Sequence, residues 1–213
     1  MSSGVILAID TAGAFASVAL GRDGVELGSA ESGGEHSHSE NLTGLIEKVL
    51  RDASVTFQEV RCIVLGRGPG SFTGLRIGFA TVQGLSVGRA ELAIHPMPSA
   101  LGARSKRVLS SAGKGLVFDS QVDVARGTSS CSMRAIDAQT DSNLPVETEV
   151  VALAPIPEIA GIPVARGVAS GLLAVFVSLP DTFPAVSEIA ALEPDYVRSV
   201  AAKSIAERRV AAL

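Results

Sequence analysis

The first third of the chain carries a clear pattern of apolar and polar positions. A continuous apolar run, Val5 to Ile9, ends in Asp10, and two further strand-like runs follow at residues 15–20 and 25–31. Turn residues at 21–24 separate the second run from the third, and glycines after Ser32 end it. The pattern therefore predicts three antiparallel strands in a meander.

The spacing of apolar residues then changes to that of a helix. Five apolar side chains fall on one helical face: Leu42, Leu45, Ile46, Val49 and Leu50. A strand is expected at 62–65, a second helix at 73–88 and a short strand at 92–95. This βββαβα order predicts an α/β fold with a mixed sheet, typical of one lobe of the actin-like, ribonuclease-H-like architecture.

Beyond residue 95 the pattern is weaker. We expect strands at 115–118, 150–153 and 163–165, a short helix at 185–192 and a final helix at about 197–210. We place a boundary near residue 100. Residues 1–100 then form an N-terminal actin-like lobe, and residues 101–213 a smaller second lobe with a C-terminal helix.

Composition narrows the class of protein. The 213 residues are 46% apolar and 19% charged, which excludes a disordered chain. The net charge of -4 argues against a protein that grips nucleic acid alone. Two cysteines are too few for a disulfide scaffold, and the longest uncharged apolar stretch is too short for a membrane helix. We expect a cytoplasmic protein without a membrane anchor.

The glycine-rich segment 66–78 precedes and enters the second predicted helix, where free backbone amides can bind a phosphate. It nevertheless lacks the lysine of a Walker loop, and Ser71 stands where a dinucleotide-binding loop has its third glycine. Pro69 and Thr73 occupy the glycine positions of a nucleophile elbow. The segment therefore matches none of these known loops.

The same helix contains several glycines, each of which lowers helix stability by about 0.8–1 kcal/mol relative to alanine. Gly74, Gly78, Thr81 and Gly88 fall on one stripe. Two interpretations stay open: the stripe packs inside the monomer, or it receives a helix of a partner. The second interpretation predicts that Gly78→Leu preserves folding and abolishes partner binding.

Candidate ligands for metal or nucleotide are few. His36 and His38 precede a helix, with His95 far along the chain, and do not make a site of three or four ligands. Asp10 and Thr11 end the first strand, where an actin-like ATPase has an acidic residue that helps to hold metal and phosphates. An ordinary turn is the simpler interpretation, so both residues are weak candidates for cofactor binding.

Several segments together resemble the bacterial TsaB (YeaZ) family. They are Ile9-Asp10-Thr11, Ser17 to Leu20, His38 to Leu42, Gly68 to Gly78 and Tyr196-Val197-Arg198. The string from Gly68 to Gly78 is specific, and the likeness is good over residues 5–95 and thin from 100 onward. The resemblance implies a two-lobed actin-like (ASKHA) fold related to the M22 glycoprotease group.

The resemblance also implies a role in forming N6-threonylcarbamoyladenosine at position 37 of tRNAs that read codons beginning with A. In that pathway the catalytic paralogue TsaD transfers the threonylcarbamoyl group, the ATPase TsaE joins the complex, and TsaB is a non-catalytic partner. The chain would then meet tRNA only within the complex. It would hold no cofactor by itself, since ATP and metal belong to its partners. A homodimer is the alternative assembly.

The family pairs with its partner through its first two helices, which correspond to residues 38–53 and 73–88. The partner-interface residues implied here are Glu40, Asn41, Gly44, Glu47, Gly74, Gly78, Thr81, Leu85 and Gly88. The chain departs from the family at Asp119 to Val124, where two arginines and a tyrosine of the usual motif are missing. The alternative function is an autonomous ATPase or M22-type peptidase of the same fold.

Overall fold

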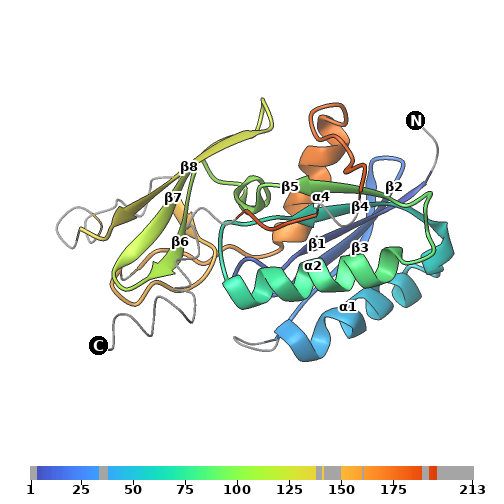
Figure 1. The fold of residues 1–213 in the computed structure, drawn as a ribbon, viewed down its shortest axis with the longest axis horizontal. Helices are drawn as coiled ribbons and strands as arrows, with labels where there is room; N and C mark the ends of the chain where they lie inside the picture. The colour runs from blue at the N-terminus through green and yellow to red at the C-terminus, as the bar shows by residue number, and fades with distance from the viewer. Residues whose placement is uncertain are drawn as a thin grey trace, which may run out of the picture.

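A computed structural model describes residues 4–33, 38–137, 141, 150–159, 161–188 and 192–195. Two sheets organise this part of the chain (Figure 1). The first sheet has the order β3-β2-β1-β4-β5 and the second β8-β7-β6-β9. Together with three helices they make a mixed α/β fold of the actin-like type, as the sequence pattern predicts.

The strand β1 lies at the centre of the first sheet, between an antiparallel neighbour and a parallel one. The strands are β1 (Val5–Asp10), β2 (Ser17–Arg22), β3 (Val25–Glu31), β4 (Val60–Gly66) and β5 (Ala93–Met97). The predicted meander is confirmed, because β1 pairs with β2 and β2 with β3 in antiparallel register. The apolar runs of β1 and β4 are buried because helices cover both faces of the sheet.

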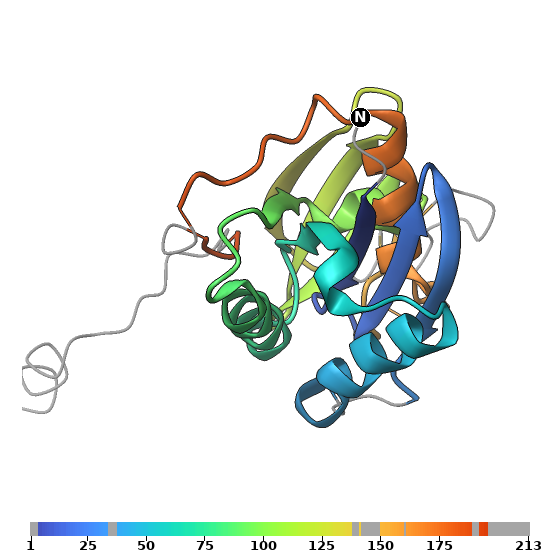
Figure 2. The ribbon, with the colours of Figure 1, turned by 90° about the vertical axis from the view of Figure 1, so that its right-hand side faces the viewer.

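Helices α1 (His38–Asp52) and α2 (Phe72–Ser86) lie on one side of this sheet, and α4 (Val168–Ser178) lies on the other (Figure 2). Contacts with β2 and β3 position α1, and contacts with β1 and β4 position α2. Both helices were predicted, with slightly different ends. No helix of the described ranges combines the length and apolar character that a membrane crossing requires.

The second sheet comprises β6 (Arg107–Gly113), β7 (Leu116–Asp123), β8 (Thr128–Ala135) and β9 (Val150–Ala152). Two short 3₁₀ turns are η1 (Phe57–Glu59) and η2 (Ser99–Ala103). The strands β6 and β8 and the helix α4 were not predicted. The predicted strand at 163–165 is reduced to a single bridge between Val164 and Ala152.

The predicted helix at 185–192 is wrong for the residues that the structure describes. Residues 185–188 form neither helix nor strand, and the Val186 amide donates to the Ile94 carbonyl, 2.9 Å away. This segment therefore lies along the edge strand β5, where a helix could not make that bond. The predicted helix at 197–210 lies outside the described residues.

The division into lobes at residue 100 stays a prediction. Residues 107–152 contribute a sheet of their own, while α4 packs on β1 and β2 of the first sheet. The chain thus returns to the first sheet after it completes the second.

An ion-pair network ties three strands of the second sheet together. Arg107 on β6 donates to both oxygens of Asp119 on β7, at 2.9 and 2.6 Å, and Arg134 on β8 donates to Asp119 at 2.8 Å. Arg134 also donates to both oxygens of Asp141. Burial raises the pKa of Asp119, but the two arginines outweigh it and hold that pKa below its usual value.

We expect Asp119→Asn to lower the free energy of unfolding by about 2 kcal/mol at pH 7, because two partly buried guanidinium groups lose their shared carboxylate. An Asp with a lowered pKa contributes stability above its unfolded pKa and loses it as the pH falls. The difference between parent and variant should therefore shrink below about pH 4. Urea titrations at pH 7 and pH 3.5 measure it, and a difference independent of pH would contradict the ionic explanation.

Candidate partner interface

The glycine-rich loop between β4 and α2 packs directly on the turn that follows β1. The Ser71 amide donates to the Ala12 carbonyl at 2.8 Å, and a Cβ at Gly70 would overlap that same oxygen. The Ser71 hydroxyl in turn accepts the Gly74 amide at 3.1 Å and caps α2. The chain itself thus supplies an acceptor for one of the free amides at the start of the helix, that of Gly74.

Two glycines inside α2 continue this contact. A Cβ at Gly74 would overlap the Thr11 carbonyl oxygen, and a Cβ at Gly78 would overlap the Thr11 hydroxyl. Both glycines are buried. The first two turns of α2 therefore press against residues 11–12.

This arrangement corrects one of our expectations. Gly74 and Gly78 do not form an outward ridge, because the stripe turns toward Thr11 within the same chain. Glycine at these positions marks a close approach of two backbones, but its neighbour is the turn after β1. The expectation that Gly78→Leu preserves folding rests on the wrong face of the helix.

Asp10 is fully buried beside this contact. Its Oδ1 accepts the Ala12 amide at 3.0 Å, while Oδ2 faces Gly66, where a Cβ would overlap it. Within the described part of the chain, Asp10 Oδ2 and Thr11 Oγ1 have no hydrogen-bond partner. Burial is the largest cause of a pKa for Asp10 that is raised to about 6.

Asp10 and Thr11 are both fully buried. Asp10 is sealed by backbone and by Gly66 instead of facing an open cleft. Among the described residues, no group of three or more His, Cys, Asp or Glu side chains comes together. His95 contacts the Phe183 carbonyl through Nδ1 at 2.6 Å, and the side chains of His36 and His38 lie outside the description.

The outer surface of α1 and α2 presents the remaining predicted interface residues. Gly44, Glu47 and Gly88 are exposed, and Thr81 and Leu85 are half-buried. The backbone of Glu40 and Asn41 belongs to α1, and their side chains lie outside the description. The two helices contact each other, so that they form one continuous surface (Figure 2).

The structure adds residues to this surface that the sequence reasoning missed. Ala80 and Gly84 are exposed on the outer face of α2, Ile77 is half-buried at its border, and Phe72 is 49% exposed. Nothing lies within 4 Å of a Cβ built at Gly84 or at Gly44. The sequence could have predicted this outer face, because the apolar residues Leu75, Phe79 and Val82 mark the side of α2 that faces the core. Residues on the opposite side of the helix are then expected to be exposed.

Comparison with known proteins gives matches over the same N-terminal region. The family model for TsaD, tRNA N6-adenosine threonylcarbamoyltransferase, matches residues 32–101. The chain is similar to the tRNA threonylcarbamoyladenosine biosynthesis protein TsaB of Escherichia coli, with 40% identity over 87 residues, 41% of this chain and 37% of that protein. TsaB of Haemophilus influenzae is 34% identical over 97 residues, 46% of this chain and 40% of that protein. The chain thus spans about two fifths of the curated relatives that it matches.

A solved structure extends the likeness in fold. YeaZ from Pseudomonas aeruginosa superposes with a TM-score of 0.64 over 91% of this chain and 99% of that one, at 23% sequence identity. At this identity the likeness concerns the fold.

We expect Gly78→Ala to lower the melting temperature by several degrees, because its Cβ would overlap the Thr11 hydroxyl in a packed core. Gly84→Ala is the matched control on the same helix, and it should keep or raise the melting temperature by removing a helical glycine. Thr11→Ala combined with Gly78→Ala should recover part of the loss. Equal melting temperatures for the two single variants would contradict the inward orientation of Gly78.

We expect the Asp10→Asn variant to become more stable relative to the parent protein as the pH rises. An Asp whose pKa is higher in the folded than in the unfolded protein stabilises the folded state most at a pH below its unfolded pKa, near 4. That stabilisation is lost as the pH rises through its folded pKa, about 6. Asparagine does not titrate, so the free energy of unfolding of the variant should rise by about 2 kcal/mol relative to that of the parent between pH 4 and pH 7. Urea unfolding of both proteins across this range measures the change, and parallel curves would show that Asp10 is not a buried acid.

Proposed function

Because the chain belongs to the TsaB (YeaZ) family, we propose that it is a non-catalytic subunit of a complex that forms N6-threonylcarbamoyladenosine in tRNA. It pairs with a TsaD-like catalytic paralogue, and a TsaE-like ATPase completes the complex. The modified nucleotide is adenosine 37 of tRNAs that read codons beginning with A. The chain meets tRNA only through this complex, as its net charge of -4 favours.

The observation that carries this proposal is the closed glycine loop. An actin-like enzyme binds phosphates with loops and helix ends that leave their amides open, whereas here Gly70, Ser71 and Gly74 pack on the backbone of residues 11–12. The buried Asp10 faces Gly66 on the same side. A chain built in this way holds no ATP or metal by itself and depends on its partners for chemistry.

The outer surface of α1 and α2 is the proposed docking surface for the TsaD-like paralogue. Exposed small residues at Gly44, Ala80 and Gly84 let a partner helix come close, and Ile77 and Phe72 supply apolar area at the border. Because Gly74 and Gly78 hold α2 on the sheet, they act on this interface only through the position of the helix. A homodimer through the same surface competes with the heterodimer.

The rival function, an autonomous ATPase or M22-type peptidase, requires a nucleotide or metal site of its own. The described residues offer neither an open phosphate loop nor a metal-ligand cluster that favours it. The same closed loop that supports a partner subunit therefore argues against this alternative.

The test is to place a bulky side chain on the docking surface. Gly84→Trp has open space around its Cβ, so the protein should fold normally and bind the TsaD-like paralogue of the same organism at least tenfold more weakly. In cells depleted of their own TsaB, the parent chain should restore threonylcarbamoyladenosine in tRNA and Gly84→Trp should not.

Ser130→Trp, exposed on β8 of the second sheet, is the control and should bind and restore modification like the parent. Size-exclusion binding assays and mass spectrometry of tRNA nucleosides provide the measurements. Normal binding and modification with a folded Gly84→Trp variant would overturn the docking surface. Failure of the parent chain to restore modification would overturn the function itself.

A further inference from the structure

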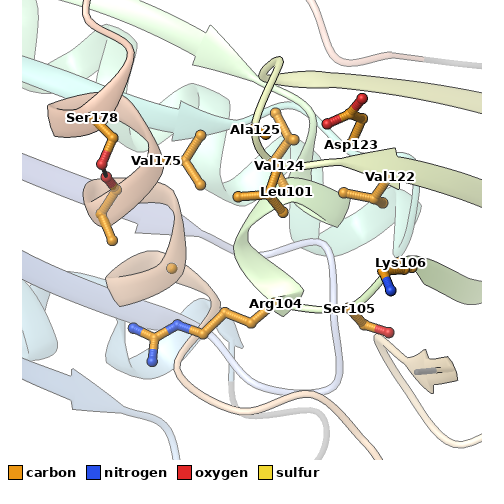
Figure 3. Close-up of a pocket in the computed structure, with 12 residues that line it drawn as sticks. Leu101, Arg104, Ser105, Lys106, Val122, Asp123, Val124, Ala125, Val175 and Ser178 are labelled. Carbon is orange, nitrogen blue, oxygen red and sulfur yellow. Dashed lines mark hydrogen bonds between the residues drawn. The ribbon is translucent and has the colours of Figure 1, made fainter. Parts of the chain in front are cut away.

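A hollow of about 740 Å³ lies beside α4, the helix that packs on the side of the first sheet away from α1 and α2. Its walls are α4, η2 and the turn between β7 and β8 (Figure 3). This volume is within the range of small-ligand sites in proteins. Neither the closed glycine loop nor the proposed docking surface contributes residues to it.

The hollow follows from small residues on α4. At Gly171 the helix touches η2 so closely that a Cβ would overlap the Gly102 carbonyl oxygen. The next residues along the same side, Ala174 and Ser178, are small and exposed, and leave space where η2 and the turn diverge from the helix. The small residues on this face of α4 therefore account for the hollow.

The inner surface of the hollow is apolar. Leu101 and Val175 are buried, Val122 is half-buried, and Val124 is 42% exposed at the turn. Figure 3 shows these side chains directed into the space between α4 and the β7–β8 turn. A large apolar side chain such as Val124, exposed beside an apolar cavity, is a feature of surfaces that bind a partner molecule.

The charges at the rim are unequal. Arg104 contributes a cation to the rim, and Figure 3 places it apart from Asp123. Asp123 is already engaged, because its carboxylate accepts the Arg126 amide at 3.1 Å and lies 3.6 Å from the Arg126 guanidinium. Arg104 is exposed and makes no hydrogen bond or ion pair with any described residue. The rim therefore offers a cation to a ligand.

The backbone of Arg104 adds a second observation. Its φ of 55° and ψ of 36° are left-handed, a conformation that glycine adopts most easily at the end of a helix. Arginine at this position carries a conformational cost that glycine would avoid. The folded protein tolerates that cost at the residue whose guanidinium borders the hollow.

We propose that this hollow binds a small amphipathic anion, with an apolar body against Leu101, Val122 and Val175 and a carboxylate or phosphate at Arg104. The ligand is held by burial of its apolar part and by charge-assisted hydrogen bonds from the guanidinium. The site goes beyond the proposed function, because it lies across the sheet from the docking surface and requires no partner for binding.

The probe is 8-anilinonaphthalene-1-sulfonate, which combines an aromatic body with one negative charge. We expect saturable fluorescence enhancement with the folded full chain, and amide shifts in its NMR spectrum at Leu101, Val122, Val124 and Val175. Decanoate and decyl phosphate should displace the probe, which compares the two head groups, and decanol should displace it much less.

Two variants test the assignment. Arg104→Gly retains the left-handed backbone without its cost, so the protein should fold as well as the parent and bind at least tenfold more weakly. Ala174→Phe should fill the hollow and abolish binding. The matched control is Lys114→Gly, which removes another exposed cation from a left-handed position, φ 55°, in the β6–β7 turn, and should bind like the parent.

Three outcomes would overturn the proposal. They are binding that does not saturate, equal affinity of the parent and Arg104→Gly, or an equal loss in Lys114→Gly. Displacement by decanol as effective as by decanoate would overturn the anion as the recognised group. None of these results depends on a TsaD-like partner, so this site and the proposed function can fail separately.

Discussion

Helix α2 lies on the turn after β1 with almost no side chain between the two backbones. Gly70, Gly74 and Gly78 make this approach feasible, since a Cβ at any of them would overlap an oxygen of Thr11 or Ala12. Two of these glycines stand inside the helix, where each weakens it by up to about 1 kcal/mol. Burial of Leu75, Phe79 and Val82 offsets that cost and holds the helix on the sheet.

This contact determines what each side of the first sheet can do. Because Gly70, Gly74 and Gly78 turn toward residues 11–12, the exposed residues of α2, among them Ala80 and Gly84, lie on the face of the helix away from the sheet, which is the proposed docking surface. On the opposite side, α4 seals the sheet and its contact with η2 at Gly171 shapes the hollow beside Arg104. Both proposed binding surfaces thus depend on glycines that bring a helix close to a neighbouring backbone.

The sequence predicted the first sheet well because each of its elements has one buried side and a clear boundary. The period of α1 and the apolar runs of β1 and β4 are examples. The helix α4 was not predicted because it has no polar stripe, the feature by which an amphipathic helix is recognised in a sequence. Seven of its eleven residues are buried. The strand β8 escaped for the opposite reason, since its serines at 129, 130 and 132 show no apolar alternation.

The glycines of α2 show what a sequence pattern alone leaves undetermined. Glycine spacing in α2 correctly indicates a close approach, but it does not say which backbone approaches. The apolar side chains of the helix decide that, and they place Gly74 and Gly78 toward the core and Gly84 away from it. The glycine spacing therefore predicts that a segment packs closely on α2, but tertiary packing determines which segment that is. The same reasoning applies to Asp10. Its place at the end of β1 made it a weak candidate for cofactor binding, and only the tertiary structure, with Gly66 and residues 11–12 beside it, shows that its carboxylate is buried.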